Sequence, residues 1–177
     1  MKKKNKESKP KAGKLTGYVR PSWDEYFLGL LPAIAARATC DRGRCAAILV
    51  EPNSKTILTA GYTGSAPGDD HCDDVGHFMV SINWPDGSSS QHCQRTLHAE
   101  ENAILQAAME GIPLRGATLY CKMTPCVYCA RRIARVGVKR VVVLKRYHAD
   151  KMTVELFKKC GVKLEVMEDK VEEYKNQ

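Results

Sequence analysis

The amino-acid sequence predicts an α/β fold in which a five-stranded mixed sheet lies between helices. After residue 98, apolar residues at helical spacing alternate with short apolar strand patterns, and this order implies parallel strands joined by right-handed crossovers. The uninterrupted run at 141–144 (Val-Val-Val-Leu) is typical of a buried central strand. Two earlier strand patterns flank residues 52–55 (Pro-Asn-Ser-Lys), which favour a hairpin turn, so the sheet should also contain antiparallel strands.

The first helix is expected to begin after Ser22, whose side chain suits an N-cap. Glu25 follows three residues later and completes a capping box, and Asp24 suits the positive end of a helix. Apolar residues then recur at helical spacing, although Pro32 favours a bend: Phe27, Leu30, Leu31, Ile34 and Ala38.

The other elements follow from the same periodicities and from their stop signals. Strands are predicted over 45–50, 56–60, 117–122, 140–144 and 162–167, and helices over 98–109, 125–136 and 153–160. Between them, residues 61–94 show neither pattern and are predicted to form a long loop region. A loop of about 30 residues is too long for a passive connector, so we expect a metal to hold it.

The composition is that of one ordinary domain with short ends. A chain of 177 residues with 44% hydrophobic and 27% charged residues is neither disordered nor a membrane protein, and no apolar run approaches the ~18 residues of a spanning helix. Much of the net charge of +8 lies in residues 1–14, which hold seven lysines and one glutamate. We expect a basic disordered leader over 1–17, a folded domain over 18–167 and a tail over 168–177. The leader opens no apolar segment, which predicts a cytoplasmic protein with neither a membrane nor a specific nucleic-acid partner.

Cysteine and histidine residues carry the chemical signal. Without an export signal, eight cysteines indicate thiols or metal ligands rather than disulfides. Cys126 and Cys129 stand at the start of a predicted helix, whose positive end favours the thiolates that bind zinc. His98 would complete three protein ligands and leave a position for water, as in catalytic zinc sites, provided that it lies in the first turn of its helix. Glu100 would then manage the protons of that water, whereas a closed zinc knuckle or buried thiols are the alternatives.

These segments resemble the H-x-E…P-C-x-x-C signature of the zinc nucleobase deaminases. Residues 98–104 and 125–130 look like the deoxycytidylate deaminase branch, and so do residues 20–27, 40–42 and 61–68. The resemblance covers residues 18–167 and implies a three-layer cytidine-deaminase-like fold. It also implies zinc-dependent hydrolysis of dCMP to dUMP and ammonia, which supplies dUMP for thymidylate synthesis.

The resemblance gives two residues their expected roles in that reaction. Glu100 would accept the water proton, pass it to N3 of the pyrimidine and then protonate the departing amine. The carbonyl group of Thr124, just before the Pro-Cys pair, would accept a hydrogen bond from the exocyclic amine.

The resemblance also implies a second, structural zinc, which some members of the branch carry. Its ligands would be Cys40, Cys72, His71 and Cys93, with His92 as a competitor for the histidine position, and the metal would clamp the long loop region. Cysteines packed as small hydrophobes are the alternative. The remaining cysteines, Cys45, Cys121 and Cys160, are assigned to the core, and His77 and His148 receive no role.

Contacts to the substrate or to an effector are expected from the 61–68 loop and from nearby cations. Thr63 stands where the family commonly has Asn, and a hydroxyl lacks the paired donor and acceptor of an amide. A monophosphate needs a cation, and the candidates are Arg42, Arg95, Lys122 and Arg131, while Tyr147 would cover the pocket.

Several alternatives remain open at the level of the sequence. Within the superfamily, the substrate would instead be cytidine, a riboflavin precursor or a tRNA adenosine. A binding module with a purely structural zinc is disfavoured, because such a site has no use for Glu100 beside a ligand. The resemblance further implies a homo-oligomer, a hexamer in this branch, that responds to dCTP and dTTP.

Overall fold

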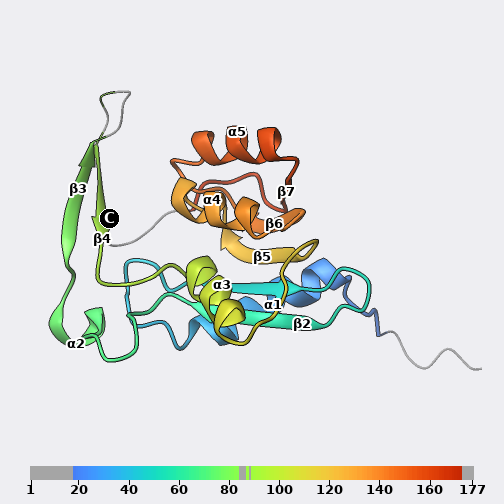
Figure 1. Ribbon diagram of the computed structural model, residues 1–177, viewed down its shortest axis with the longest axis horizontal. Coiled ribbons are helices and arrows are strands. Elements are labelled where there is room, and N and C mark those ends of the chain that lie inside the picture. Colours follow the sequence, from blue (N-terminus) through green and yellow to red (C-terminus); the bar gives the residue numbers. More distant parts are fainter. Residues whose placement is uncertain (1–17, 84–86, 88, 173–177) are drawn as a thin grey trace, which may run out of the picture.

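A five-stranded sheet lies at the centre of the molecule (Figure 1). This computed structural model describes residues 18–83, 87 and 89–172. The strand order is β2-β1-β5-β6-β7; β1 runs antiparallel to β2 and β5, whereas β5, β6 and β7 are parallel. In that order the strands are Ile57–Tyr62, Ala46–Val50, Thr118–Met123, Arg140–Lys145 and Lys163–Val166. The predicted α/β class with a mixed sheet is confirmed.

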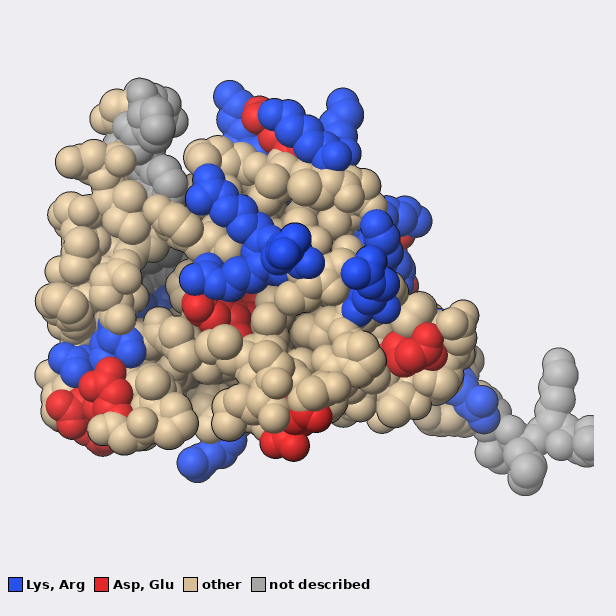
Figure 2. Space-filling view, viewed as in Figure 1, with Lys and Arg blue, Asp and Glu red and all other residues tan. Residues whose placement is uncertain are grey.

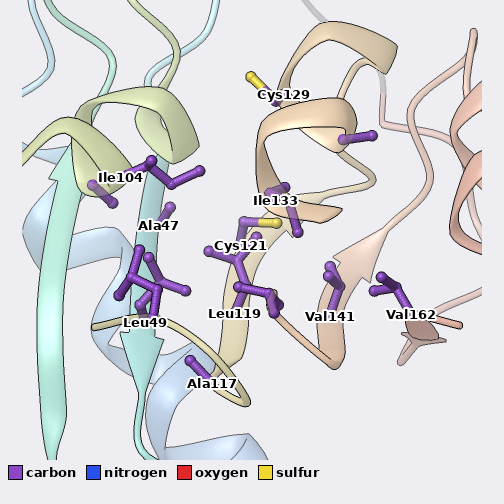
Figure 3. Packing of buried hydrophobic residues seen from close by; sticks show 14 of the residues in the cluster. Ala47, Leu49, Ile104, Ala117, Leu119, Cys121, Cys129, Ile133, Val141 and Val162 are labelled. Atoms are coloured by element: carbon purple, nitrogen blue, oxygen red, sulfur yellow. The ribbon is translucent and has the colours of Figure 1, made fainter. Parts of the chain in front are cut away.

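Helices cover both faces of the sheet and produce three layers. Helix α1 (Trp23–Ala35) packs on one face through Phe27 and Leu31. Helices α3 (Ala99–Met109), α4 (Val127–Arg135) and α5 (Lys151–Cys160) share the opposite core (Figure 3). Because successive strand residues point to opposite faces, alternate residues enter the two cores: Ala47, Leu49, Leu119, Cys121, Val141 and Val143 on the side of α3, and Ala46, Ile48, Val50, Tyr120 and Val142 on the side of α1.

The start of α1 is the capping box that the sequence predicts. The Glu25 backbone N–H donates to Ser22 Oγ at 3.3 Å, and the Ser22 backbone N–H donates to the Glu25 carboxylate at 2.7 Å. Two of the N–H groups that a helix start leaves without partners are thereby satisfied. Pro32 lies inside the helix, as expected.

The predicted loop region contains regular structure, and this prediction was wrong in that respect. A one-turn helix, α2 (Cys72–Val75), is followed by a two-stranded antiparallel sheet of β3 (Met79–Asn83) and β4 (Ser89–Cys93), which stands beside the main domain in Figure 1. β4 is almost wholly polar, so it carries no apolar alternation to reveal it. Cross-strand hydrogen bonds hold the pair instead, including Gln91 Nε2 to Ser81 Oγ at 2.6 Å.

The chain does not leave the domain at residue 167, where the sequence analysis placed the start of a tail. The Glu168 N–H donates to the Leu144 carbonyl at 2.8 Å, and the Arg146 N–H donates to the Lys170 carbonyl at 2.7 Å. The described part of the predicted tail therefore lies along β6 and its extension. The predicted leader, residues 1–17, lies outside the described residues.

Two surface properties complete the description. Among the described residues, no helix combines the length and the apolar character that crossing a membrane requires. Figure 2 shows lysine and arginine side chains gathered over α4 and α5. Both helices carry basic residues in their last turn, where positive charge complements the helix dipole: Arg132, Arg135, Lys158 and Lys159.

Candidate active site

The three residues predicted to bind the first metal lie together at the starts of two helices. His98 is the N-cap of α3, Cys126 is the N-cap of α4, and Cys129 follows in the first turn of α4. His98 Nδ1 lies 3.4 Å from Cys126 Sγ and 3.5 Å from Cys129 Sγ. His98 therefore lies at the beginning of its helix, which was the condition for it to reach the two cysteines.

The donor set fits a tetrahedral zinc ion. Zinc–sulfur bonds of about 2.3 Å and zinc–nitrogen bonds of about 2.0–2.1 Å place a sulfur and a nitrogen ligand about 3.5 Å apart. All three ligand atoms lie within 4.8 Å of one another, and Cys129 is buried. The hydrogen bond from Cys129 and the neighbouring His98 lower the pKa of the Cys126 thiol to about 3, which favours the metal-binding thiolate. Three ligands leave one position of a tetrahedron for water or substrate.

Glu100 lies two residues after His98, in the first turn of α3, and is 8% exposed. Its burial raises the pKa of the carboxyl group above the ordinary value of 4.5. A buried carboxyl group beside such a three-ligand metal site can exchange a proton with a water molecule or a bound base there.

A cavity of about 130 Å³ lies beside these residues. Its walls come from the segment after Cys40, from β4, from the start of α3 and from the end of β5. Five of the residues predicted to contact substrate or effector line it: Arg42, Thr63, Lys122, Thr124 and Tyr147. His92 lines it too, together with His98, Glu100 and Cys126.

The other two predicted cations lie outside the lining of this cavity. Arg95 Nε donates to the Gly76 carbonyl at 3.2 Å, and its guanidinium faces Asp69 and Asp70. The guanidinium of Arg131 lies over the Tyr128 ring, 5.9 Å from its centroid. Both cations are close to the motifs in the sequence, but neither lines the cavity.

Thr63 is held in the cavity wall by interactions that the sequence analysis did not foresee. The Asn102 side chain donates to the carbonyl groups of Tyr62 and Gly64, at 2.8 and 3.3 Å, and so fixes the backbone on both sides of Thr63. Gly61 lets β2 approach α3, because a Cβ atom there would lie 2.5 Å from the Ala99 carbonyl oxygen. The Gly-Tyr-Thr segment thus depends on helix α3, which also supplies Glu100.

A second group of residues that could hold a metal ion lies beside the same cavity, and its members correct the predicted set. Cys40, Cys72, His77 and Cys93 place one ligand atom each within 4.8 Å of one another. Cys72 Sγ lies 3.5 Å from Cys93 Sγ, and Cys40 Sγ lies 3.7 Å from His77 Nδ1. These separations suit a closed tetrahedral zinc site of three sulfurs and one nitrogen.

The histidine of this group is His77, to which no role had been assigned, rather than His71 or His92. His71 is the exposed N-cap residue of α2, and His92 lines the cavity and lies outside the group. His77 Nε2 lies 2.9 Å from the Asp41 carboxylate, which orients the ring so that Nδ1 faces Cys40. Only the position of His77 shortly after Cys72 could have suggested it from the sequence.

The three cysteines that were assigned to the core differ in their burial. Cys121 is buried, and burial raises its thiol pKa. Cys45 is partly buried and lines the cavity, and burial raises its thiol pKa to about 12. Cys160 is exposed at the end of α5, so its assignment to the core was wrong.

Comparisons with known proteins agree with this site. Residues 21–145 match the sequence model of the cytidine and deoxycytidylate deaminase zinc-binding region. ComE operon protein 2 of Bacillus subtilis (strain 168) is 37% identical over 149 residues, which are 84% of this chain and 73% of that protein. The deoxycytidylate deaminase of Schizosaccharomyces pombe is 35% identical over 145 residues, 82% of this chain but 44% of the yeast protein.

A solved structure has a similar fold. The dCMP deaminase of cyanophage S-TIM5, crystallised in complex with dCMP and dUMP, superimposes with a TM-score of 0.65 at 27% identity and covers 85% of this chain and 100% of the phage chain. Residues 21–145, which the family model matches, contain the three ligands of the first metal group and Glu100. The chain therefore belongs to the zinc-binding cytidine and deoxycytidylate deaminase family.

Proposed function

We propose that the protein hydrolyses dCMP to dUMP and ammonia, and so supplies dUMP for thymidylate synthesis in the cytoplasm. The observation that carries this proposal is the buried Glu100 carboxyl group beside the three-ligand group of His98, Cys126 and Cys129 at one cavity. The names of the yeast relative and of the phage enzyme, the latter in complex with dCMP and dUMP, support the choice of substrate.

A zinc ion held by His98, Cys126 and Cys129 would lower the pKa of a coordinated water towards neutrality. Glu100 accepts a proton from the water and delivers it to N3 of the pyrimidine as the water oxygen bonds to C4. Glu100 then accepts the proton of the new C4 hydroxyl group and transfers it to the amino group, the C4–N bond breaks as the C4 carbonyl forms, and ammonia leaves. One carboxyl group serves as base and as acid, which suits a group whose proton affinity is raised by burial.

Other residues of the cavity orient the substrate. The Thr124 carbonyl accepts a hydrogen bond from the exocyclic amine, and Thr63 contacts the sugar or base in place of the Asn that the family commonly has. Arg42 and Lys122 supply positive charge for the monophosphate, and Tyr147, whose hydroxyl pKa is raised by burial, covers the pocket.

The direct test is a comparison of substrates. Purified zinc-loaded protein is given dCMP, deoxycytidine, cytidine, the pyrimidine precursor of riboflavin and a tRNA with a wobble adenosine, and ammonia release is measured. We expect the highest kcat/KM for dCMP. A higher value for any of the other four would assign the chain to that activity instead.

We also propose that Cys40, Cys72, His77 and Cys93 hold a second, structural zinc, and that the chain forms a homo-oligomer that responds to dCTP and dTTP. The chemistry of the donor set supports the metal. The family resemblance supports the oligomer and its effectors, and the position of Thr63 in the cavity wall would let a change in the 61–68 loop reach the substrate.

A further inference from the structure

The chain after β7 is built into the wall of the catalytic cavity. We define the C-terminal strap as residues 168–172, which follow β6 through backbone hydrogen bonds to Leu144 and Arg146. The last of these bonds is donated by the Glu172 N–H to the Arg146 carbonyl at 2.8 Å. The strap is therefore fixed up to Glu172.

Glu172 places a buried carboxylate between two lysines. Its side chain is 8% exposed; Oε1 lies 2.5 Å from Lys122 Nζ, and Oε2 lies 2.8 Å from Lys145 Nζ. Burial by itself would raise the pKa of Glu172, but the two ammonium groups keep it below its ordinary value. A buried charge is costly without partners, so this carboxylate and its two lysines form one interdependent group.

Lys122 is the member of this group that lines the cavity. The two lysines and one carboxylate carry a net charge of +1 as a group, so Glu172 does not neutralise both of its partners. An ammonium group has three donors, so Lys122 can bond to Glu172 and still donate to a ligand. A lysine held in this way loses less side-chain entropy when it binds an anion than a lysine that moves freely in solvent.

A second chain of contacts joins the strap to the same wall. Asp169 pairs with Arg146 at 2.5 Å, Arg146 pairs with Asp150 at 3.3 Å, and Asp150 accepts a hydrogen bond from Thr124 Oγ1 at 3.2 Å. Thr124 lines the cavity and is almost completely buried. The strap thus contacts Lys122 directly and is linked to Thr124 indirectly, by way of Arg146 and Asp150.

We propose that the C-terminal strap is part of the nucleotide site. In this site Lys122 contacts the phosphate group and determines specificity for it, and Glu172 is a positioning residue that holds Lys122 in place. The inference rests on the proposed function for its substrate class, a nucleoside monophosphate. Lys122 then distinguishes dCMP from deoxycytidine, and Glu172 acts only through Lys122.

The test compares dCMP with deoxycytidine on the full, zinc-loaded chain. Lys122→Met should raise the KM for dCMP roughly tenfold with little change in kcat, because a charged hydrogen bond to the phosphate is lost. Glu172→Gln preserves the shape but removes the charge, and should raise the same KM severalfold. Neither substitution should alter the KM for deoxycytidine, which has no phosphate. The matched controls, Lys158→Met and Glu155→Gln on the exposed face of α5, should leave all constants unchanged.

The contrary outcome is equally specific. If Lys122→Met and Glu172→Gln lower the melting temperature but leave the KM for dCMP within about twofold of its original value, the strap is only structural and the inference is wrong. The unaltered chain tests the proposed function separately, through release of dUMP from dCMP. If it does not deaminate dCMP, calorimetry with dUMP and deoxyuridine still tests Lys122: loss of the preference for dUMP in Lys122→Met supports the inference, and an unchanged preference contradicts it.

Discussion

At the scale of single residues, Glu100 is expected to be required for turnover but not for metal binding. Glu100→Gln keeps the size of the side chain and all three metal ligands, but its amide cannot accept and return a proton. We expect turnover of dCMP to fall by roughly 10²–10⁴-fold, the usual contribution of a general acid–base, with the zinc content unchanged. Initial rates and metal analysis on the same preparation check this prediction.

The matched control is Glu101→Gln on the next residue of α3, where the partly buried carboxylate pairs with Arg132 at 3.0 Å. It removes the same charge and should leave turnover within a few-fold of the original. A fully active Glu100→Gln protein would contradict the mechanism.

What the sequence predicts at this scale depends on local geometry. His98, Cys126 and Cys129 are predictable because helix starts fix where their side chains point, and short-range spacing determines those starts. The choice of His77 over His71 depends on the path of an irregular segment around Gly76, whose φ of 85° no periodic pattern encodes. Glu172 was missed because a polar strap without apolar periodicity resembles a tail.

At the scale of elements, the second metal group ties α2, β4 and the segment before β1 together. We expect about two zinc ions per chain in freshly purified protein, and about one after Cys72→Ala or His77→Ala, with a lowered melting temperature in each case. His71→Ala is the matched control and should retain both metals, because His71 lies outside the group. Inductively coupled plasma analysis measures the stoichiometry. One zinc per chain in the unaltered protein would refute the second site.

The contact between β2 and α3 gives a second prediction at this scale. In Gly61→Ala the new Cβ would lie 2.5 Å from the Ala99 carbonyl and closer still to the Ala103 nitrogen, so strand and helix must separate. We expect a loss of about 1–3 kcal/mol in the free energy of unfolding. Denaturant titration measures it. Gly29→Ala in α1 is the control, because its Cβ would contact nothing within 4 Å, and it should be neutral or stabilising.

The elements themselves differ in how far the sequence specifies them. The α-β alternation after residue 98 and the apolar run at 141–144 predicted the parallel half of the sheet, because buried strands and amphipathic helices leave strong periodic signals. β4 left no such signal because it is almost wholly polar, and β3 left only one short alternation of apolar and polar residues, since the pair lies outside the main core.

At the scale of the whole molecule, one ionic network connects the first helix to the last strand. Arg140 donates to both oxygens of Asp24 at 2.8 Å and also pairs with Glu165. Hydrogen bonds from Arg140 lower the pKa of both carboxyl groups below their ordinary values of 3.8 and 4.5. Groups with lowered pKa values stabilise the fold above their unfolded pKa, and this contribution is lost as the pH falls through their folded pKa.

The prediction is therefore a pH-dependent difference between Asp24→Asn and the unaltered chain. Asp24→Asn should be less stable by about 1 kcal/mol at pH 7, and the difference should shrink as the pH falls below about 4. Urea titrations of both proteins at each pH measure it, and the comparison cancels any loss of metal common to the two. A difference that stays constant down to pH 3 would show that the charge of Asp24 contributes nothing.

The last prediction concerns assembly. Leu105 and Met109 lie four residues apart on α3 and are 44% and 78% exposed, so this helix presents an apolar pair to solvent that a second copy would cover. We expect sedimentation at micromolar concentration to give a hexamer, six times the chain mass of 19.7 kDa, and Met109→Glu to shift it towards smaller species. A monomer for the unaltered chain would overturn this expectation.

Regulation by dCTP requires that it bind one conformation of the protein better than another. If it does so, sigmoidal dCMP kinetics should become hyperbolic when dCTP is added. Curves unaffected by dCTP or dTTP would show that a chain with Thr63 in the nucleotide loop lacks effector control.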